Sequence, residues 1–367
     1  MDMYSNSGTT MLVEKKSWID ETEIEDTPII SSFVLLENSD KFNVDEKSFN
    51  LDILGQPMFT WVARACPSIP VTIQTNGISN PLELIRPYLK DADYTVVLYS
   101  DTPLVKKSTI EEIIDYVRNK GLNVCKLSRG WVYKTEYIKR VGEVFAPQTY
   151  KFNEDEFMCV DDHFSMQKAR QILKNRILDF HSKNGVIFTS PELVEIDANV
   201  TIGKNTILSG HCRISSKTQI GENCKLVDCK INSSKVCERT TILGAVVDKS
   251  VIENDCLIDN KTIVADRSLV QKNTIIGKNN NITKTSIGEN VKIGDNNIIT
   301  SARIHDLCTI ENVNILAGEE QKTIKILSNS CIGSGCKVNC GVMVGEGVII
   351  SNFKTIMHSL RQGENND

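Results

Sequence analysis

The feature that most constrains the fold of this chain is a six-residue repeat that begins near residue 196. Large aliphatic residues recur at every sixth position, and a small or slender residue follows four positions later. A period of six fits neither an α-helix nor the alternation of an isolated strand. It fits a parallel β-helix in which each hexapeptide forms one flat side of a coil. The aliphatic residues expected to point inward are Ile196, Ile202, Leu208, Ile214, Ile220, Leu226, Ile252, Ile258, Val264, Val270, Ile276, Ile282, Ile298, Ile304, Ile326, Ile332, Val338 and Val344.

The small position and the glycines of the repeat give two further predictions. Small residues are expected to face inward at the corners, where cysteine acts as a compact apolar residue. The cysteines and serines at this position are Cys212, Cys224, Cys256, Cys308, Cys336, Ser268, Ser286 and Ser330. Glycine often follows the aliphatic residue directly, where we expect a tight turn between sides. These glycines are Gly203, Gly221, Gly277, Gly288, Gly294, Gly333 and Gly345.

The repeat loses its six-residue count in two places, at residues 226–241 and 311–325. The second stretch, ENVNILAGEEQKTIK, is predicted to form a loop that projects from the coil, and it is either functional or a tolerated insertion. Cys331, Cys336 and Cys340 lie nearby. They form no C-x-x-C pair and have no histidine cluster beside them, so zinc is not predicted.

The N-terminal half alternates apolar, β-branched segments with segments of helical periodicity. Such an alternation predicts a mostly parallel sheet that is covered by helices on both faces. Ligands are then expected at the carboxyl ends of the strands. The predicted strands are 29–37, 71–76, 95–100 and 123–127, and the predicted helices are 57–66, 81–92, 109–120 and 166–183.

Capping residues bound two of the predicted helices. Ser108 is expected to cap the helix that Gly121 ends. Ser165 is expected to cap the long helix that Asn184 and Gly185 close.

Acidic residues follow two apolar runs in this half of the chain. The run TVVLYS ends at Asp101, and FMCV, at 157–160, is predicted to be a short strand that delivers Asp161 and Asp162. Asp101 is therefore expected at the ligand-binding edge of the sheet. The rest of the segment 129–164 has no clear pattern.

Composition excludes several classes of function. The formal charge of −5 and the pI near 5.7 leave no basic face for a polyanion, so nucleic acid is not an expected partner. No stretch has the roughly 18 to 20 apolar residues of a membrane span, and the N-terminus lacks the order of a secretory signal. We therefore expect a cytoplasmic protein with no membrane partner, whose 12 cysteines are mostly reduced thiols.

An α/β half, a long helix and a hexapeptide β-helix together resemble the bifunctional N-acetylglucosamine-1-phosphate uridylyltransferase and glucosamine-1-phosphate acetyltransferase family. The resemblance runs from about residue 30 to about residue 350. LGQPM at 54–58 is similar to the family's G-[KR]-P-M, and LYSDTPL at 98–104 is similar to its Y-G-D-x-P-L. VDD at 160–162 stands where the family has V-N-N.

The resemblance implies a cofactor and partners. Asp101 and Asp161 would hold a catalytic Mg²⁺, which takes oxygen ligands and neutralises charge during nucleotidyl transfer. The substrates would be a nucleotide and a sugar phosphate, as in UDP-N-acetylglucosamine metabolism. The β-helix would assemble the chain as a homotrimer.

The implied fold class is α/β plus β, with a Rossmann-like nucleotidyltransferase domain followed by a left-handed parallel β-helix. The expected divisions are a leader at 1–30, the nucleotidyltransferase-like domain at 31–164, a linker helix at 165–190, the hexapeptide β-helix at 191–355 and a tail at 356–367. No role is predicted for the leader.

The chain departs from the family where the nucleotide would be gripped. The family's glycine loop cradles the triphosphate with backbone N–H groups. At the matching place this chain has LLENSDKF, at 35–42, which brings Glu37 and Asp40 instead of glycine and arginine. Lys47 is expected to stand in for the family's substrate-binding lysine. The family's base-binding stretch has no counterpart before Asp101.

Three functions are open from the sequence. The first is a magnesium-dependent sugar-1-phosphate nucleotidyltransferase with weakened or lost activity. The second is a noncatalytic trimeric scaffold or regulatory relative. The third is a hexapeptide-repeat acyltransferase. The family's acetyl-transfer motifs, H-x-x-Y-x-G-D and N-Y-D-G, do not occur, and His305 and His358 are expected to be surface residues.

Overall fold

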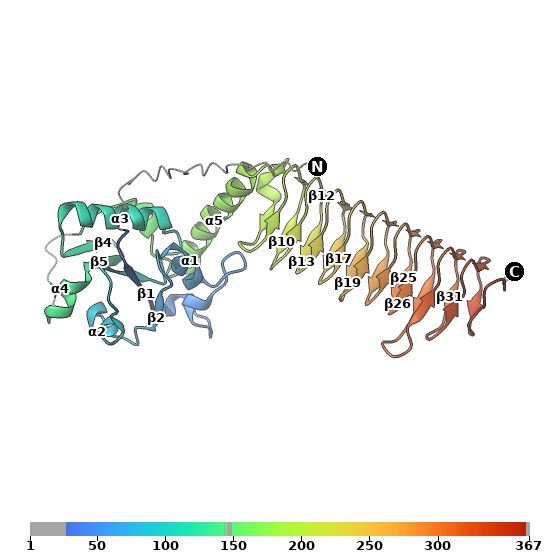
Figure 1. Cartoon of the computed structure of the whole chain (residues 1–367), viewed down its shortest axis with the longest axis horizontal. Helices are drawn as coiled ribbons and strands as arrows, with labels where there is room; N and C mark the ends of the chain where they lie inside the picture. Colours follow the sequence, from blue (N-terminus) through green and yellow to red (C-terminus); the bar gives the residue numbers. More distant parts are fainter. Residues whose placement is uncertain (1–26, 143, 145–148, 365–367) are drawn as a thin grey trace, which may run out of the picture.

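The computed structural model describes residues 27–142, 144 and 149–364, so most of the predicted leader lies outside the described residues (Figure 1). The N-terminal part is a five-stranded sheet in the order β2-β1-β3-β5-β4. β1 runs parallel to β2 and β3, as predicted, while β5 runs antiparallel to β3 and β4. The strands are β1 (Ile30–Leu36), β2 (Val71–Gln74), β3 (Tyr94–Tyr99), β4 (Val124–Leu127) and β5 (Gly130–Lys134).

Helices cover both faces of this sheet, as the alternation predicted. Val62 of α1 and Ile110 of α3 belong to one apolar cluster, and Ile85 of α2 and Ile138 of α4 belong to the other. The α-helices are α1 (Met58–Ala65), α2 (Pro81–Ile85), α3 (Lys107–Lys120) and α4 (Thr135–Arg140). The 3₁₀ helices are η1 (Asp40–Phe42), η2 (Ser48–Asn50), η3 (Arg86–Tyr88), η4 (Glu154–Phe157) and η5 (Pro191–Leu193). None of the described helices is long and apolar enough to cross a membrane.

The long helix α5 (His163–Lys183) begins earlier than predicted. Its N-cap is Asp162 and not Ser165, because the Asp162 carboxylate accepts the N–H of Ser165 while the Ser165 hydroxyl closes the capping box. The start of α3 also precedes the predicted cap Ser108, which lies within the first turn. Gly121 ends α3 as predicted, with φ at 62°.

The predicted strand at 157–160 is not formed. Phe157 ends η4, and the residues after it belong to no strand of the described chain. Because Val160 instead donates its N–H to the carbonyl oxygen of Asp101, at 2.7 Å, this segment still runs beside the end of β3. The position next to β3 in the sheet is taken by β5, which the sequence did not predict.

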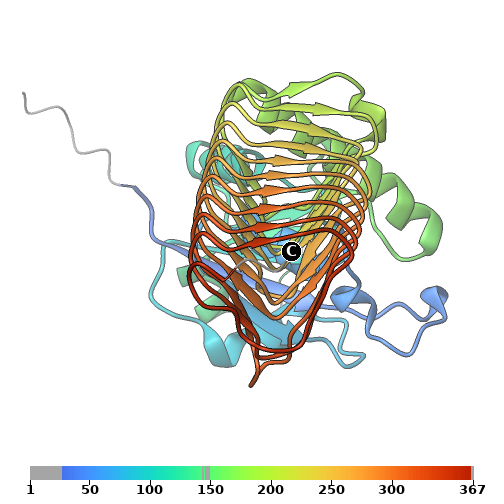
Figure 2. The same ribbon diagram turned by 90° about the vertical axis from the view of Figure 1, so that its right-hand side faces the viewer.

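From β6 onward the chain forms a left-handed parallel β-helix, as expected, with stacked coils of three sides (Figure 2). The first sheet contains β6 (Ile187–Phe188), β9 (Ile207–Ser209), β12 (Lys225–Val227), β15 (Thr241–Leu243), β18 (Leu257–Ile258), β21 (Ile275–Ile276), β24 (Lys292–Ile293), β27 (Thr309–Ile310), β30 (Cys331–Ile332) and β33 (Ile349–Ile350). The second contains β7 (Glu195–Ile196), β10 (Arg213–Ser215), β13 (Lys230–Asn232), β16 (Val246–Asp248), β19 (Ile263–Ala265), β22 (Asn281–Thr283), β25 (Ile298–Thr300), β28 (Ile315–Ala317), β31 (Lys337–Val338) and β34 (Thr355–Ile356). The third contains β8 (Thr201–Ile202), β11 (Gln219–Ile220), β14 (Lys235–Val236), β17 (Val251–Ile252), β20 (Leu269–Val270), β23 (Ser286–Ile287), β26 (Ala302–Ile304), β29 (Ile324–Ile326) and β32 (Met343–Val344).

Most inward positions of the repeat are buried as predicted, including those of the five corner cysteines. Two predictions are wrong where the count slips by one. Ile298 is 46% exposed and Ile299 points inward instead, while Ser286 is exposed and Thr285 fills the corner. Some sides are five residues long, and the stretch 226–241 is therefore a regular part of the coil and not an interruption.

The glycines after the aliphatic residue serve close packing between coils and not a turn with positive φ. A Cβ on Gly203 would lie 2.6 Å from the backbone nitrogen of Glu222 in the next coil. Positive φ falls mainly on asparagine and other residues near the corners, as in Asn205 at 60° and Asn223 at 57°. Asparagine tolerates this left-handed region better than most residues with a Cβ.

The predicted loop at 311–325 is shorter in the structure. Residues 311–317 continue the coil through β28, and the projecting part is 318–323 (Figure 1). Gly318 begins this projection and passes close to the neighbouring coil, where a Cβ would lie 2.3 Å from the carbonyl oxygen of Ser301.

The two ends of the β-helix differ, since the first coil is covered and, within the described chain, the last is paired along one side only. At the first coils, Leu178 of α5 joins the apolar core of the β-helix. Leu173 of the same helix packs in a cluster of the α/β domain, so α5 connects the two cores. At the last coils, the backbone of Leu360 bonds to Met343 and Gly345 and pairs with the end of β32.

Candidate functional site

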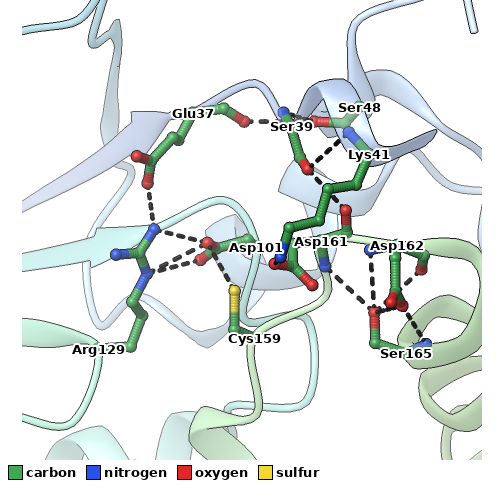
Figure 3. Close-up of polar contacts among 10 residues, drawn as sticks. All are labelled: Glu37, Ser39, Lys41, Ser48, Asp101, Arg129, Cys159, Asp161, Asp162 and Ser165. Carbon is green, nitrogen blue, oxygen red and sulfur yellow. Dashed lines mark hydrogen bonds and ion pairs between the residues drawn. The ribbon is translucent and has the colours of Figure 1, made fainter. Parts of the chain in front are cut away.

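The candidate site lies at the carboxyl ends of β1 and β3, the edge at which α/β sheets bind ligands (Figure 3). Asp101 follows β3, and the bond from Val160 to its carbonyl oxygen places Asp161 beside it. The structure therefore brings the two predicted metal ligands together. Their role as ligands stays a prediction.

The carboxylate of Asp101 is buried and is held by Arg129, which lies in the turn between β4 and β5. Nε of Arg129 lies 3.2 Å from Oδ1 of Asp101, and Nη2 lies 2.6 Å from Oδ2. Nη2 also pairs with the carboxylate of Glu37, which follows β1. Cζ of Arg129 lies over the ring of Tyr99, 4.1 Å from the ring centroid.

These neighbours keep Arg129 charged. Burial lowers the pKa of the Arg129 guanidinium, but its hydrogen bonds to Asp101 and the charges of Asp101 and Glu37 outweigh burial and raise the pKa above its ordinary value. The thiol of Cys159 completes this group by donating to Oδ2 of Asp101 at 3.2 Å. Partial desolvation of the thiol and the adjacent Asp101 carboxylate raise the pKa of Cys159 to about 12, so the thiol is neutral.

The carboxylate of Asp161 has a cationic partner of its own. Lys41, in η1, forms an ion pair with Asp161, and the hydrogen bond and charge of Asp161 raise the pKa of Lys41. The hydroxyl of Ser39 donates to the carbonyl oxygen of Asp161 at 2.6 Å. The loop after β1 is thus tied to the segment that precedes α5.

The same loop uses backbone N–H groups within the protein. Glu37 donates its N–H to the hydroxyl of Ser100 at 3.1 Å, and Ser39 donates its N–H to the hydroxyl of Ser48 at 2.8 Å. The N–H of Lys41 points to the hydroxyl of Ser39 at 3.4 Å. The family's glycine loop offers such groups to phosphate oxygens. Here they are already paired with side chains of the chain itself.

Lys47, the predicted substrate-binding residue, lines a hollow of about 230 Å³ between the ends of β1 and β2. Glu37 and Asn38 line the same hollow, together with Gln74 and Asn76. Lys47 is exposed, and its binding role stays a prediction.

A divalent cation does not fit the two carboxylates as they are arranged. Mg²⁺ takes oxygen ligands in a near-octahedral shell, which requires carboxylate oxygens that face open space or water. Asp101 presents both oxygens to Arg129, and Asp161 presents one to Lys41. In the described part of the chain, no group of three or more His, Cys, Asp or Glu side chains is arranged to hold a metal ion.

The LGQPM stretch lies at the junction with the β-helix. The carbonyl oxygen of Leu54 accepts the N–H of Ala198 at 2.9 Å. A Cβ on Gly55, whose φ is 78°, would lie 2.7 Å from the carboxylate carbon of Asp197. The glycine of this motif therefore allows the two domains to approach each other.

Sequence reasoning missed the cations of the site. Arg129 lies in the segment that had no clear pattern, and its signal is the dipeptide Arg129-Gly130 between two strand-like runs. A hairpin turn at the sheet edge brings a long basic side chain to the carboxyl end of β3. Lys41 was part of the quoted LLENSDKF stretch, but its partner Asp161 lies far away in sequence.

A second group of polar side chains lies on the β-helix. Arg267, Lys284, Ser301 and Arg303 line a hollow of about 320 Å³ beside the projection at 318–323. Lys284 pairs with Glu320 of the projection at 2.6 Å, whereas Arg267 and Arg303 have no ion-pair partner among the described residues. An adjoining hollow of about 480 Å³ shares Ser286 and Arg303 with this one and is bordered by His305. His305 and His358 are exposed, as expected.

Comparison with known proteins finds relatives along most of the chain. No family model matches. The chain is 22% identical over 374 residues to a bifunctional protein GlmU of Clostridioides difficile, which covers 83% of this chain and 75% of the relative. It is 28% identical over 252 residues to a GlmU of Clostridium botulinum and 28% identical over 157 residues to one of Lactobacillus johnsonii. These two alignments span 53% and 34% of the relatives' own length.

Solved structures give a weaker likeness. LpxA from Acinetobacter baumannii is 14% identical, with a TM-score of 0.31 over 47% of this chain and 67% of that one. The UDP-N-acetylglucosamine acyltransferase of Francisella novicida is 17% identical, with a TM-score of 0.26 over 49% of this chain and 63% of that one. TM-scores this low carry no weight for the function of this chain.

Proposed function

Because this chain is a divergent GlmU-like protein, we propose that it is a sugar-1-phosphate nucleotidyltransferase-like protein of nucleotide-sugar metabolism in which nucleotidyl transfer is weak or lost. One observation carries this proposal, namely the loop at 37–41, in which the N–H groups of Glu37, Ser39 and Lys41 donate to hydroxyls of the protein. A triphosphate would have to displace these bonds to be held by the backbone. The serine hydroxyls that accept these bonds would then need new partners, which offsets part of the gain from binding the phosphate.

Electrostatics supports the same proposal. Around the site stand four carboxylates, of which three are paired with only two cations, Arg129 and Lys41. A unit charge pair of like sign at 4 Å costs about 4 kcal/mol at an effective dielectric of 20. The site is therefore net negative and repels the phosphates that a nucleotidyltransferase must bind. The four carboxylates are those of Glu37, Asp101, Asp161 and Asp162.

Turnover tests the proposal directly. Purified protein is incubated with magnesium, UTP and N-acetylglucosamine-1-phosphate, and pyrophosphate release is followed. We expect release no faster than in an Asp101→Asn control, and rapid release that is lost in this variant would overturn the proposal. Melting curves with UTP, CTP, GTP and ATP then separate two outcomes. Stabilisation without turnover supports a nucleotide-binding regulatory role, and no stabilisation supports a scaffold.

We propose, as the setting, a cytoplasmic homotrimer that assembles through the flat sides of the β-helix. Each side is a long, regular surface on which a second copy can pack, as is general for solenoids. Sedimentation at the mass of three chains is expected. Sedimentation at the 41.0 kDa mass of one chain would contradict this assembly.

A second candidate function is ligand binding by the β-helix, of the kind a hexapeptide-repeat acyltransferase requires. The hollow with Arg267 and Arg303 favours it, because two guanidinium groups without ion-pair partners in the described chain can take an anionic ligand. Consumption of acetyl coenzyme A in the presence of glucosamine-1-phosphate, lost in Arg303→Ser, would support this function. Absence of consumption would remove it.

A further inference from the structure

Arg129 joins three parts of the α/β domain that are far apart in sequence. Its guanidinium spans the carboxylates of Asp101 after β3 and Glu37 after β1, while it extends from the turn between β4 and β5 (Figure 3). The ring of Tyr99 lies beneath it. A planar guanidinium with several N–H donors suits such a position, because it can engage two carboxylates at once.

Because the Arg129 guanidinium already occupies the carboxylate of Asp101, no room is left there for a metal cation. Nε and Nη2 of Arg129 address both oxygens of this carboxylate, so a metal ion bound there would stand against the guanidinium charge. Two positive charges bound to the same carboxylate repel each other, and this repulsion is stronger where the site is partly shielded from water. Arg129 and a divalent cation at Asp101 therefore exclude each other.

We infer that the Arg129 guanidinium is a built-in counter-ion, which takes the position of a divalent cation at Asp101 and keeps the strand-end site assembled without a metal. This inference rests on the proposed function only in that both concern the same site. It gives Arg129 a positioning role, because it holds the loop after β1 against the end of β3.

Removal of Arg129 should convert the site into one that binds a divalent cation. Without the guanidinium, the carboxylates of Glu37 and Asp101 lose their shared partner and stand at the same strand-end edge as that of Asp161. Oxygen ligands of this kind are what hard divalent cations prefer. A neutral residue at position 129 is therefore expected to create a metal site that the native chain lacks.

The test is binding of Mn²⁺, followed by electron paramagnetic resonance in the absence of nucleotide. The native chain is expected to show no saturable site. The Arg129→Ser chain is expected to bind one Mn²⁺ at least tenfold more tightly than the native chain binds Mn²⁺ at any position. The double variant Arg129→Ser with Asp101→Asn should lose this site. Arg118→Ser, which removes an exposed arginine from α3, is the matched control and should not create one.

Two results would overturn the inference. One is saturable Mn²⁺ binding by the native chain that Asp101→Asn abolishes. The other is a folded Arg129→Ser chain that gains no site. If Arg129→Ser does not fold, Arg129→Gln replaces it, because glutamine is neutral and can still donate to Asp101. A folded Arg129→Gln chain without a site also refutes the inference. None of these readouts depends on turnover, so they stand apart from the pyrophosphate assay.

Discussion

The contact between Arg129 and Asp101 should be among the strong polar interactions of the α/β domain. Removing one partner of a fully buried pair costs about 3–5 kcal/mol, because the other charge is left unpaired. The side chain of Asp101 is 9% exposed and that of Arg129 is 31% exposed, so solvent screens part of this cost. We expect Arg129→Met to lower the free energy of unfolding by about 2 kcal/mol, after this discount.

A double-mutant cycle isolates the pair. Arg129→Met, Asp101→Asn and their combination are compared by urea unfolding, and a coupling free energy of about 2 kcal/mol is expected. Tryptophan fluorescence does not report the β-helix, since the sequence from 187 to 367 contains no tryptophan; Trp61 and Trp131 lie in the α/β domain, and the third, Trp18, lies outside the described residues. The exposed pair of Glu136 and Arg140 serves as control, with an expected coupling of about 0.3–0.5 kcal/mol. A coupling between Arg129 and Asp101 no larger than that of the control would refute the reasoning.

Two further substitutions test the β-helix and its junction. Burial raises the pKa of Asp197, whose Oδ1 has no hydrogen-bond partner, so folding favours its neutral form. Asp197→Asn should therefore raise the melting temperature at pH 7, and this gain should vanish as the pH falls below the ordinary pKa of 3.8; an equal gain at pH 3 would contradict this origin. Asn297→Ala should cost about 1–3 kcal/mol, because it leaves the buried N–H of Asn314 without its acceptor at 2.8 Å. Asn281→Ala, at an exposed position, should cost little by comparison in urea unfolding followed by circular dichroism.

The β-helix could be predicted from the sequence because its signal is local and repeated. An aliphatic residue at each sixth position reports its own burial, whatever the rest of the chain does. The prediction fails where a side has five residues, as between Ile299 and Ile304, since one deleted residue exchanges inward and outward positions. Nothing in the residues beside Ser286 indicates that this side of the coil has five residues and not six.

The site could be predicted only in part, for the opposite reason. Asp101 was recognised because its apolar strand and its turn are contiguous. The partners that determine what Asp101 can do, Arg129 and Glu37, come from other strand ends and meet it only through the order of the sheet. A sequence shows which side chains are acidic or basic, but pairing between distant charges depends on topology.

The covered first coil of the β-helix has a consequence for how copies of this chain can associate. A bare terminal coil presents unpaired backbone groups in parallel register, which would template the addition of another molecule and so the growth of a fibre. Leu178 of α5 closes one such terminus, and Leu360 pairs along one side of the other. Because head-to-tail stacking needs both ends, the cover over the first coil alone opposes growth along the axis and directs contact between molecules to their flanks.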